Sequence, residues 1–125
     1  MKIINFIIDN SQHNLTIDFS ASKGVTNAQL SFEYLRICSP ENSTKKLKSG
    51  QVQVTSHKKD VTLISIESVA KHGYRLIFSD GHNAIYSEVY IHTLAIEYEA
   101  RWQSYLNDLK ATGHSREAMI EIKQL

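Results

Sequence analysis

Residues 87–113 read SEVYIHTLAIEYEARWQSYLNDLKATG, and this stretch predicts the longest helix of the chain. Ser87 is a residue type that caps helix N-termini, and Glu88 adds a negative charge to the first turn, where the helix dipole favours one. Lys110 suits the last turn and Gly113 the C-terminal cap. The apolar residues between these ends recur at helical spacing on one stripe: Ile91, Leu94, Ala95, Tyr98, Trp102, Tyr105, Leu106 and Leu109. The pattern therefore predicts one long helix whose apolar stripe packs on a core.

The rest of this helix is polar, with one aromatic exception. Glu97 and Arg101 are spaced i,i+4 and are expected to pair. Tyr90 lies off the apolar stripe, which predicts an exposed aromatic side chain and, with it, a surface for a partner. The aromatic residues on the stripe are instead interpreted as core rather than as a ligand groove.

Three segments before residue 33 are predicted to form a meander of strands. Residues 2–8 are rich in Ile and Phe. In residues 14–19 and 28–32, apolar and polar residues alternate with a period of two, which places one face of a strand on a core and the other in water. Residues 20–24 supply a turn with Gly24 at its end.

Three more strands are predicted after residue 60, at residues 61–69, 74–78 and 83–86. The first two form a hairpin, and Asp80-Gly81 turns the chain into the third. The fold class is therefore α+β: an antiparallel or mixed β-sheet with one long C-terminal helix packed on one face. Residues 1–112 are expected to form a single domain, and residues 113–125 a short helix or frayed tail.

The segment between these two groups of strands, residues 39–60, is predicted to be a long basic loop. It contains the sole proline, Pro40, and five lysines, with Val52 and Val54 as a candidate short strand. Lysines could contact phosphate, but the net charge is only +1 and no aromatic residue lies between Tyr34 and Tyr74. Nucleic-acid binding modules usually carry a basic surface with interleaved aromatics, so we expect a solvated loop and no nucleic-acid partner.

Size and composition indicate a soluble intracellular domain. The chain has 125 residues, of which 42% are hydrophobic, and its single cysteine, Cys38, allows no internal disulfide. A chain of this length needs no disulfide to be stable, and one thiol suits a reducing compartment. No run of eighteen apolar residues is present, so no membrane span is expected. We predict a cytoplasmic location.

Two motifs resemble a known family. The first is YLRICSP at residues 34–40, and the second is YRLIFSDGH at residues 74–82, followed by Ile85-Tyr86-Ser87. Together they resemble the gamma-butyrobetaine hydroxylase-like N-terminal domain, over residues 15 to 109. The resemblance implies an accessory domain, which in relatives stands alone, precedes an oxygenase domain and supports dimerisation, or accompanies iron–sulfur carrier proteins. It also implies a structural zinc site in the hydroxylases.

The family's zinc ligands transfer only in part to this sequence. Cys38 matches the first of three cysteines and His82 matches the histidine, whereas the other two cysteine positions fall at Pro40 and Ser43, which are not normal zinc ligands. Glu41 or His57 are the residues that could substitute. Read without the family, Cys38 is a half-buried apolar residue and His82 is a turn residue. From the two motifs we assign Arg36, Asp80, Gly81 and Tyr86 to a candidate binding site.

No complete catalytic set is present in the sequence. It lacks the His-x-Asp or His-x-Glu start of an oxygenase iron site, a phosphate-binding Gly-Lys loop and a Gly-x-Ser-x-Gly elbow. We therefore predict a non-catalytic accessory or protein-interaction module without a cofactor, whose partner is another protein or a second copy. The alternatives are a metal-binding domain that holds zinc at Cys38 and His82, and a small enzyme built on Arg36, Asp80 and His82.

Overall fold

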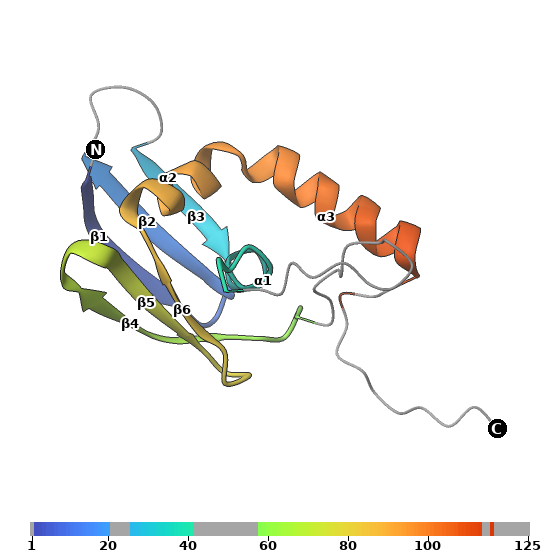
Figure 1. Ribbon diagram of the computed structural model, residues 1–125, viewed down its shortest axis with the longest axis horizontal. Coiled ribbons are helices and arrows are strands. Elements are labelled where there is room, and N and C mark those ends of the chain that lie inside the picture. Colours follow the sequence, from blue (N-terminus) through green and yellow to red (C-terminus); the bar gives the residue numbers. More distant parts are fainter. Residues whose placement is uncertain (1, 21–25, 42–57, 114–115, 117–125) are drawn as a thin grey trace.

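The computed structural model describes residues 2–20, 26–41, 58–113 and 116, and within them the N-terminal segments form the expected meander. Strands β1 (Lys2–Asp9), β2 (Asn14–Ser20) and β3 (Asn27–Ser31) pair antiparallel in that order (Figure 1). The alternation in β2 predicts one buried face, and this is confirmed, because Leu15, Ile17 and Phe19 are all buried. The candidate strand at Val52 and Val54 lies outside the described residues.

The second group of strands forms a separate antiparallel sheet. Strand β4 (Leu63–Val69) runs through the short 3-10 turn η1 (Ala70–His72) into β5 (Gly73–Phe78), and β6 (Asn83–Tyr86) pairs with β5. Gly73 begins β5 with φ +120°, and a Cβ there would lie 2.3 Å from the carbonyl oxygen of Tyr86. Only glycine fits this close backbone approach. The strand predictions are thus confirmed, but the strands divide into two three-stranded sheets rather than one.

The segment after β3 is a helix, which the sequence pattern did not indicate. The predicted strand ends at residue 32 and the predicted basic loop begins at residue 39, with no element expected between them, yet α1 spans Phe32–Ile37. The Oγ atom of Ser31 accepts a hydrogen bond from the backbone N–H of Tyr34 at 3.1 Å, which caps the helix N-terminus. Residues 32–36 are all buried, and a short, wholly buried segment shows no periodicity that separates a helix from a strand.

The predicted C-terminal helix forms with its expected ends but divides into two. The Oγ atom of Ser87 accepts a hydrogen bond from the N–H of Tyr90 and begins α2 (Glu88–Ile96), and Gly113 ends α3 (Tyr98–Thr112) in the left-handed conformation. Between them Glu97 has ψ 14°, which bends the chain away from a straight helix axis. Glu97 still pairs with Arg101, 2.9 Å away, as predicted.

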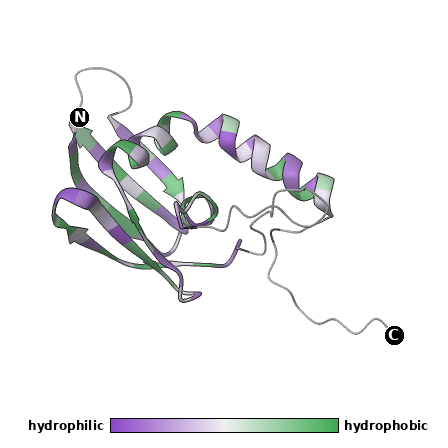
Figure 2. Ribbon diagram, viewed as in Figure 1, coloured by the Kyte–Doolittle hydropathy of each residue, from purple (hydrophilic) through white to green (hydrophobic). Residues whose placement is uncertain are grey.

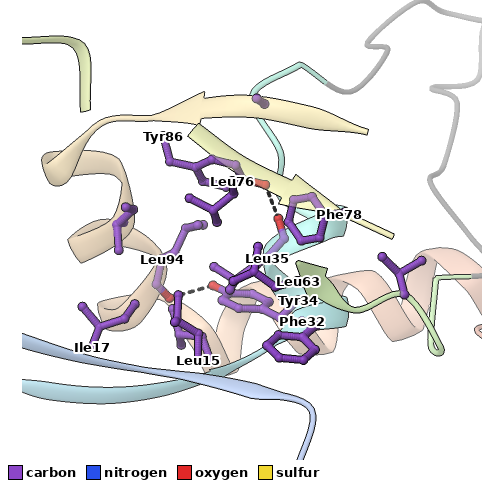
Figure 3. Packing of buried hydrophobic residues seen from close by; sticks show 14 of the residues in the cluster. Leu15, Ile17, Phe32, Tyr34, Leu35, Leu63, Leu76, Phe78, Tyr86 and Leu94 are labelled. Carbon is purple, nitrogen blue, oxygen red and sulfur yellow. Dashed lines mark hydrogen bonds between the residues drawn. The ribbon is translucent and has the colours of Figure 1, made fainter. Parts of the chain in front are cut away.

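One apolar core joins both sheets to the helices. Figure 3 shows side chains from β2, α1, β4, β5, β6 and α2 meeting in it. Two buried tyrosines cross the core: the hydroxyl of Tyr34 donates to the Leu94 carbonyl at 2.7 Å, and that of Tyr86 donates to the Leu35 carbonyl. Both polar atoms are therefore satisfied inside the core, and they tie α1 to α2 and to the second sheet.

The fold class is α+β, as predicted. Figure 2 shows hydrophobic and hydrophilic bands alternating along the strands, the pattern of sheets with one buried face. Trp102 and Tyr98 on α3 pack against the core, while Tyr105 and Leu109 are buried. None of the helices in the described part of the chain is both long and apolar enough to cross a membrane.

Candidate functional site

The two sequence motifs meet at the C-terminal end of α1. The guanidinium Nε of Arg36 donates to Oδ2 of Asp80 at 3.0 Å, although the two residues are 44 positions apart. Asp80 lies in the turn after β5, and its Oδ1 accepts the backbone N–H of His82 at 3.2 Å. Gly81 permits this turn because its φ is +86°, a value that side-chain-bearing residues rarely adopt. Arg36 therefore holds the turn at Asp80 and Gly81 against α1.

A second cation also binds Asp80. The Nζ atom of Lys58 lies 2.8 Å from Oδ2, and the side chains of Arg36, Asp80 and Lys58 are 9%, 21% and 24% exposed. Partial burial acts to raise the pKa of Asp80, but the hydrogen bonds from Lys58 and the His82 N–H and the charge of Arg36 outweigh it and lower the pKa to about 2. Such a carboxylate is a weak base, so Asp80 is suited to hold structure rather than to accept protons.

His82 bonds to a serine rather than to Asp80 through its ring. Its Nε2 atom lies 2.7 Å from the Oγ atom of Ser39, which also accepts the backbone N–H of Glu41 at 3.3 Å. Burial and the nearby charge of Arg36 lower the pKa of His82, so the imidazole is neutral at pH 7. We call Arg36, Ser39, Lys58, Asp80 and His82 together the Asp80 clasp.

A serine hydrogen-bonded to a neutral histidine is also the geometry of an activated nucleophile. Here Ser39 is only 6% exposed. The adjacent depression, about 520 Å³ and open to solvent, is lined by Glu41, Arg75, Gly81, His82, Asn83, Ala84 and Ile85. Ser39 is not among the residues that line this depression.

Cys38 faces a different part of the molecule. Its carbonyl accepts a hydrogen bond from the hydroxyl of Tyr90 at 2.5 Å, and its thiol interacts with Arg101. Burial raises the pKa of the thiol to about 11 despite the nearby arginine. Cys38 is thus a protonated, half-buried thiol. Tyr90, predicted to be exposed, is half-buried because it closes this contact.

The described donors do not fit a four-ligand zinc site. No group of three or more His, Cys, Asp or Glu side chains that could hold a metal occurs within the described ranges. Cys38 contacts α2 and α3, whereas His82 contacts Ser39, and Pro40 offers no side-chain donor. Ser43 and His57 lie outside the described residues. Among the described residues, the family's zinc ligand set is therefore not assembled.

Tyr86 and two of the histidines lie outside the clasp and pack against other parts of the fold. Tyr86 is fully buried, with its hydroxyl bonded inside the core. His92 is half-buried and packs edge-on against Phe19, with the ring centroids 4.9 Å apart, whereas His13 is exposed, with its ring centroid 6.0 Å from that of Phe32. Sequence reasoning did not single out Ser39 and Lys58 as members of the clasp, since their neighbours in sequence gave no sign of Asp80 or His82.

The fold and the clasp together make this a small α+β domain in which α1 and the residues that follow it are bonded to an Asp-Gly-His turn. The chain belongs to the gamma-butyrobetaine hydroxylase-like N-terminal family, whose sequence pattern matches residues 7–92.

Solved structures share the fold over most of their length. One solution NMR structure is 24% identical with a TM-score of 0.76, covering 99% of this chain and 96% of its own, and a second is 28% identical with a TM-score of 0.73, covering 99% and 91%. A crystal structure of a DUF971-family protein of unknown function from Acidithiobacillus ferrooxidans is 24% identical with a TM-score of 0.59, covering 75% and 92%. No curated protein matches the chain.

Proposed function

We propose that this domain is a non-catalytic accessory module that binds a partner protein. The observation that carries the proposal is where the chemically capable side chains go. Arg36, Asp80 and His82 bond to one another or to Ser39 and Lys58, so they fasten α1 to the β5–β6 turn. Because these three side chains stabilise the fold through those bonds, an enzyme that uses them for catalysis is disfavoured.

Large apolar side chains, in contrast, are left in solvent. Ile4 and Ile7 on β1 are 65% and 55% exposed, and Val89 and Ile96, seven residues apart on one face of α2, are 70% and 57% exposed. The N-terminal ends of the two elements are adjacent, since Oε2 of Glu88 accepts the backbone N–H of Ile3 at 2.8 Å. We call these four residues the β1–α2 surface. Exposed apolar side chains on adjoining elements are typical of surfaces that bind other proteins.

Affinity capture with matched variants tests this proposal. The tagged chain is expressed at its native level as wild type, as Ile4→Lys/Val89→Lys, and as Ile64→Lys. Ile64 is an apt control because it is 60% exposed but lies on β4 of the other sheet. We expect one protein to be retained by the wild type and by Ile64→Lys and lost from the double variant. Equal capture by all three chains, or none, contradicts the proposal. Sedimentation of the purified chain shows whether the partner is a second copy of the chain.

The alternative is a metal-binding domain, and one observation favours it. The segment that follows α1 and the Asp-Gly-His turn do lie together, because Ser39, next to Cys38, contacts His82. Metal analysis of the chain purified without chelators separates the two functions. The accessory module contains well below one metal ion per chain, unchanged in Cys38→Ala, whereas a stoichiometric ion that is lost in both Cys38→Ala and His82→Ala supports the metal site.

A further inference from the structure

A buried acid outside the clasp is fully bonded. Glu33 lies in the first turn of α1 and is 5% exposed. Its Oε1 accepts Nη2 of Arg116 at 2.8 Å, and its Oε2 accepts Nε of Arg116 at 3.0 Å, so the two groups make a parallel two-bond pair. The hydroxyl of Tyr105 donates to Oε2 at 2.9 Å. A carboxylate this deeply buried needs such partners, because an unpaired buried charge is costly.

An aromatic ring completes the surroundings of the same guanidinium. Its central carbon lies 5.1 Å from the centroid of the Trp102 ring. Trp102 and Tyr105 come from α3, Glu33 from α1, and Arg116 from beyond the end of α3. The groups that surround the guanidinium thus come from helices α1 and α3, whereas the guanidinium itself belongs to Arg116, which follows α3.

These groups match the chemistry of one cation. A planar guanidinium can make two parallel hydrogen bonds to a carboxylate and place its face on an aromatic ring, which the point charge of a lysine cannot do. A metal ion would need several oxygen or nitrogen donors, and here one carboxylate and a phenol converge. The arrangement of these groups therefore suits a guanidinium better than a lysine ammonium or a metal ion.

We infer that Glu33, Trp102 and Tyr105 form a guanidinium-binding site that Arg116 fills as an internal ligand, and that an arginine of a partner protein competes with Arg116 for it. The inference rests on the proposed function only for the partner. Release of Arg116 alone would leave Glu33 buried without a cation, so the exchange favours a partner that brings its own guanidinium. Arg116 then acts as a built-in competitor for that partner.

Chemical rescue tests the site without any partner. Thermal unfolding of Arg116→Ala is followed with millimolar methylguanidinium, with methylammonium as the cation control and Glu33→Gln/Arg116→Ala as the matched variant. We expect methylguanidinium to raise the melting temperature of Arg116→Ala by roughly 3–6 °C and to leave the double variant unchanged. An equal response to both cations, or in both variants, overturns the inference.

The wild-type chain gives a second measurement that does not depend on the folding of Arg116→Ala. NMR should show the Nε–H of Arg116 as a separate, slowly exchanging signal that is lost in Glu33→Gln. Exchange as fast as that of an exposed arginine in the wild type overturns the site.

Competition is tested with the peptide acetyl-Gly-Arg-Gly-amide and its lysine counterpart. The arginine peptide should bind Arg116→Ala at least about tenfold more tightly than the wild type, and the lysine peptide should bind neither. Equal binding to the two chains, or equal binding of the two peptides, overturns the competition. If rescue and competition succeed while affinity capture finds no partner, the guanidinium site stands and the proposed function fails. If capture succeeds and rescue fails, the reverse holds.

Discussion

Among the residues that the structure describes, two carboxylates each bind an arginine from a distant part of the chain, and the two differ in burial. Asp80 has a side chain that is 21% exposed and is shared by Arg36 and Lys58, whereas Glu33 is 5% exposed and faces one guanidinium through two hydrogen bonds. An exposed ion pair gains little over hydration, but a buried charge that loses its partner cannot regain water. The ion pairs in the two sites have similar distances but should therefore contribute unequally to stability.

Removal of the guanidinium from Glu33 should have the largest effect. Arg116→Ala leaves a buried carboxylate with only the Tyr105 hydroxyl, which should lower the free energy of unfolding by about 3 kcal/mol. Because the Arg116 side chain is 38% exposed, water reaches the site, and the loss should be smaller than for a fully buried ion pair. Urea titration measures it. Adding Glu33→Gln should recover part of the loss, and a larger loss in the double variant would contradict the idea that the buried charge is responsible.

Arg36→Ala should cost less, about 2 kcal/mol, although its side chain is 9% exposed. Lys58 remains on Asp80 after the change, so the carboxylate keeps a cation. The same urea titration measures the loss. A cost greater than that of Arg116→Ala would reverse the order of the two sites.

Acid should weaken the clasp through Asp80. Its pKa in the folded chain is about 2, below the ordinary value of 3.8, so the folded state binds fewer protons than the unfolded state between these pH values. The stabilisation is fully present above pH 4 and is lost as the pH falls from about 4 to about 2. After allowance for solvent screening it amounts to roughly 1 kcal/mol. Asp80→Asn should flatten this part of the stability curve, and an unchanged slope would show that Asp80 is not the group responsible.

Lys58→Met should have the smallest effect, below about 0.5 kcal/mol, because a partly exposed lysine gains little from its ion pair. Its visible consequence should be a rise in the pKa of Asp80, since the hydrogen bond from Lys58 lowers it. NMR titration of the Asp80 carboxyl carbon measures that pKa. If the pKa did not move, the second cation would be irrelevant to the clasp.

The sequence determined every element whose signal is local. Alternation in β2 and the Asp-Gly turn between β5 and β6 identified strands, and Ser87 and Gly113 identified the ends of the helical region. Each is a property of a few consecutive residues, so no knowledge of the fold is needed to read it. The two family motifs were recognised in the same way, and with them Arg36, Asp80 and His82 as a group.

Only the tertiary structure decided what those residues contact. The burial of all of residues 32–36 made α1 indistinguishable from a strand in sequence, and the bend at Glu97 has no local signal. The partners of Asp80 come from 44 and 22 residues away, and Arg116 reaches Glu33 across 83 residues. Contacts at such separations depend on how sheets and helices pack around the core, because chain connectivity alone brings none of these pairs together.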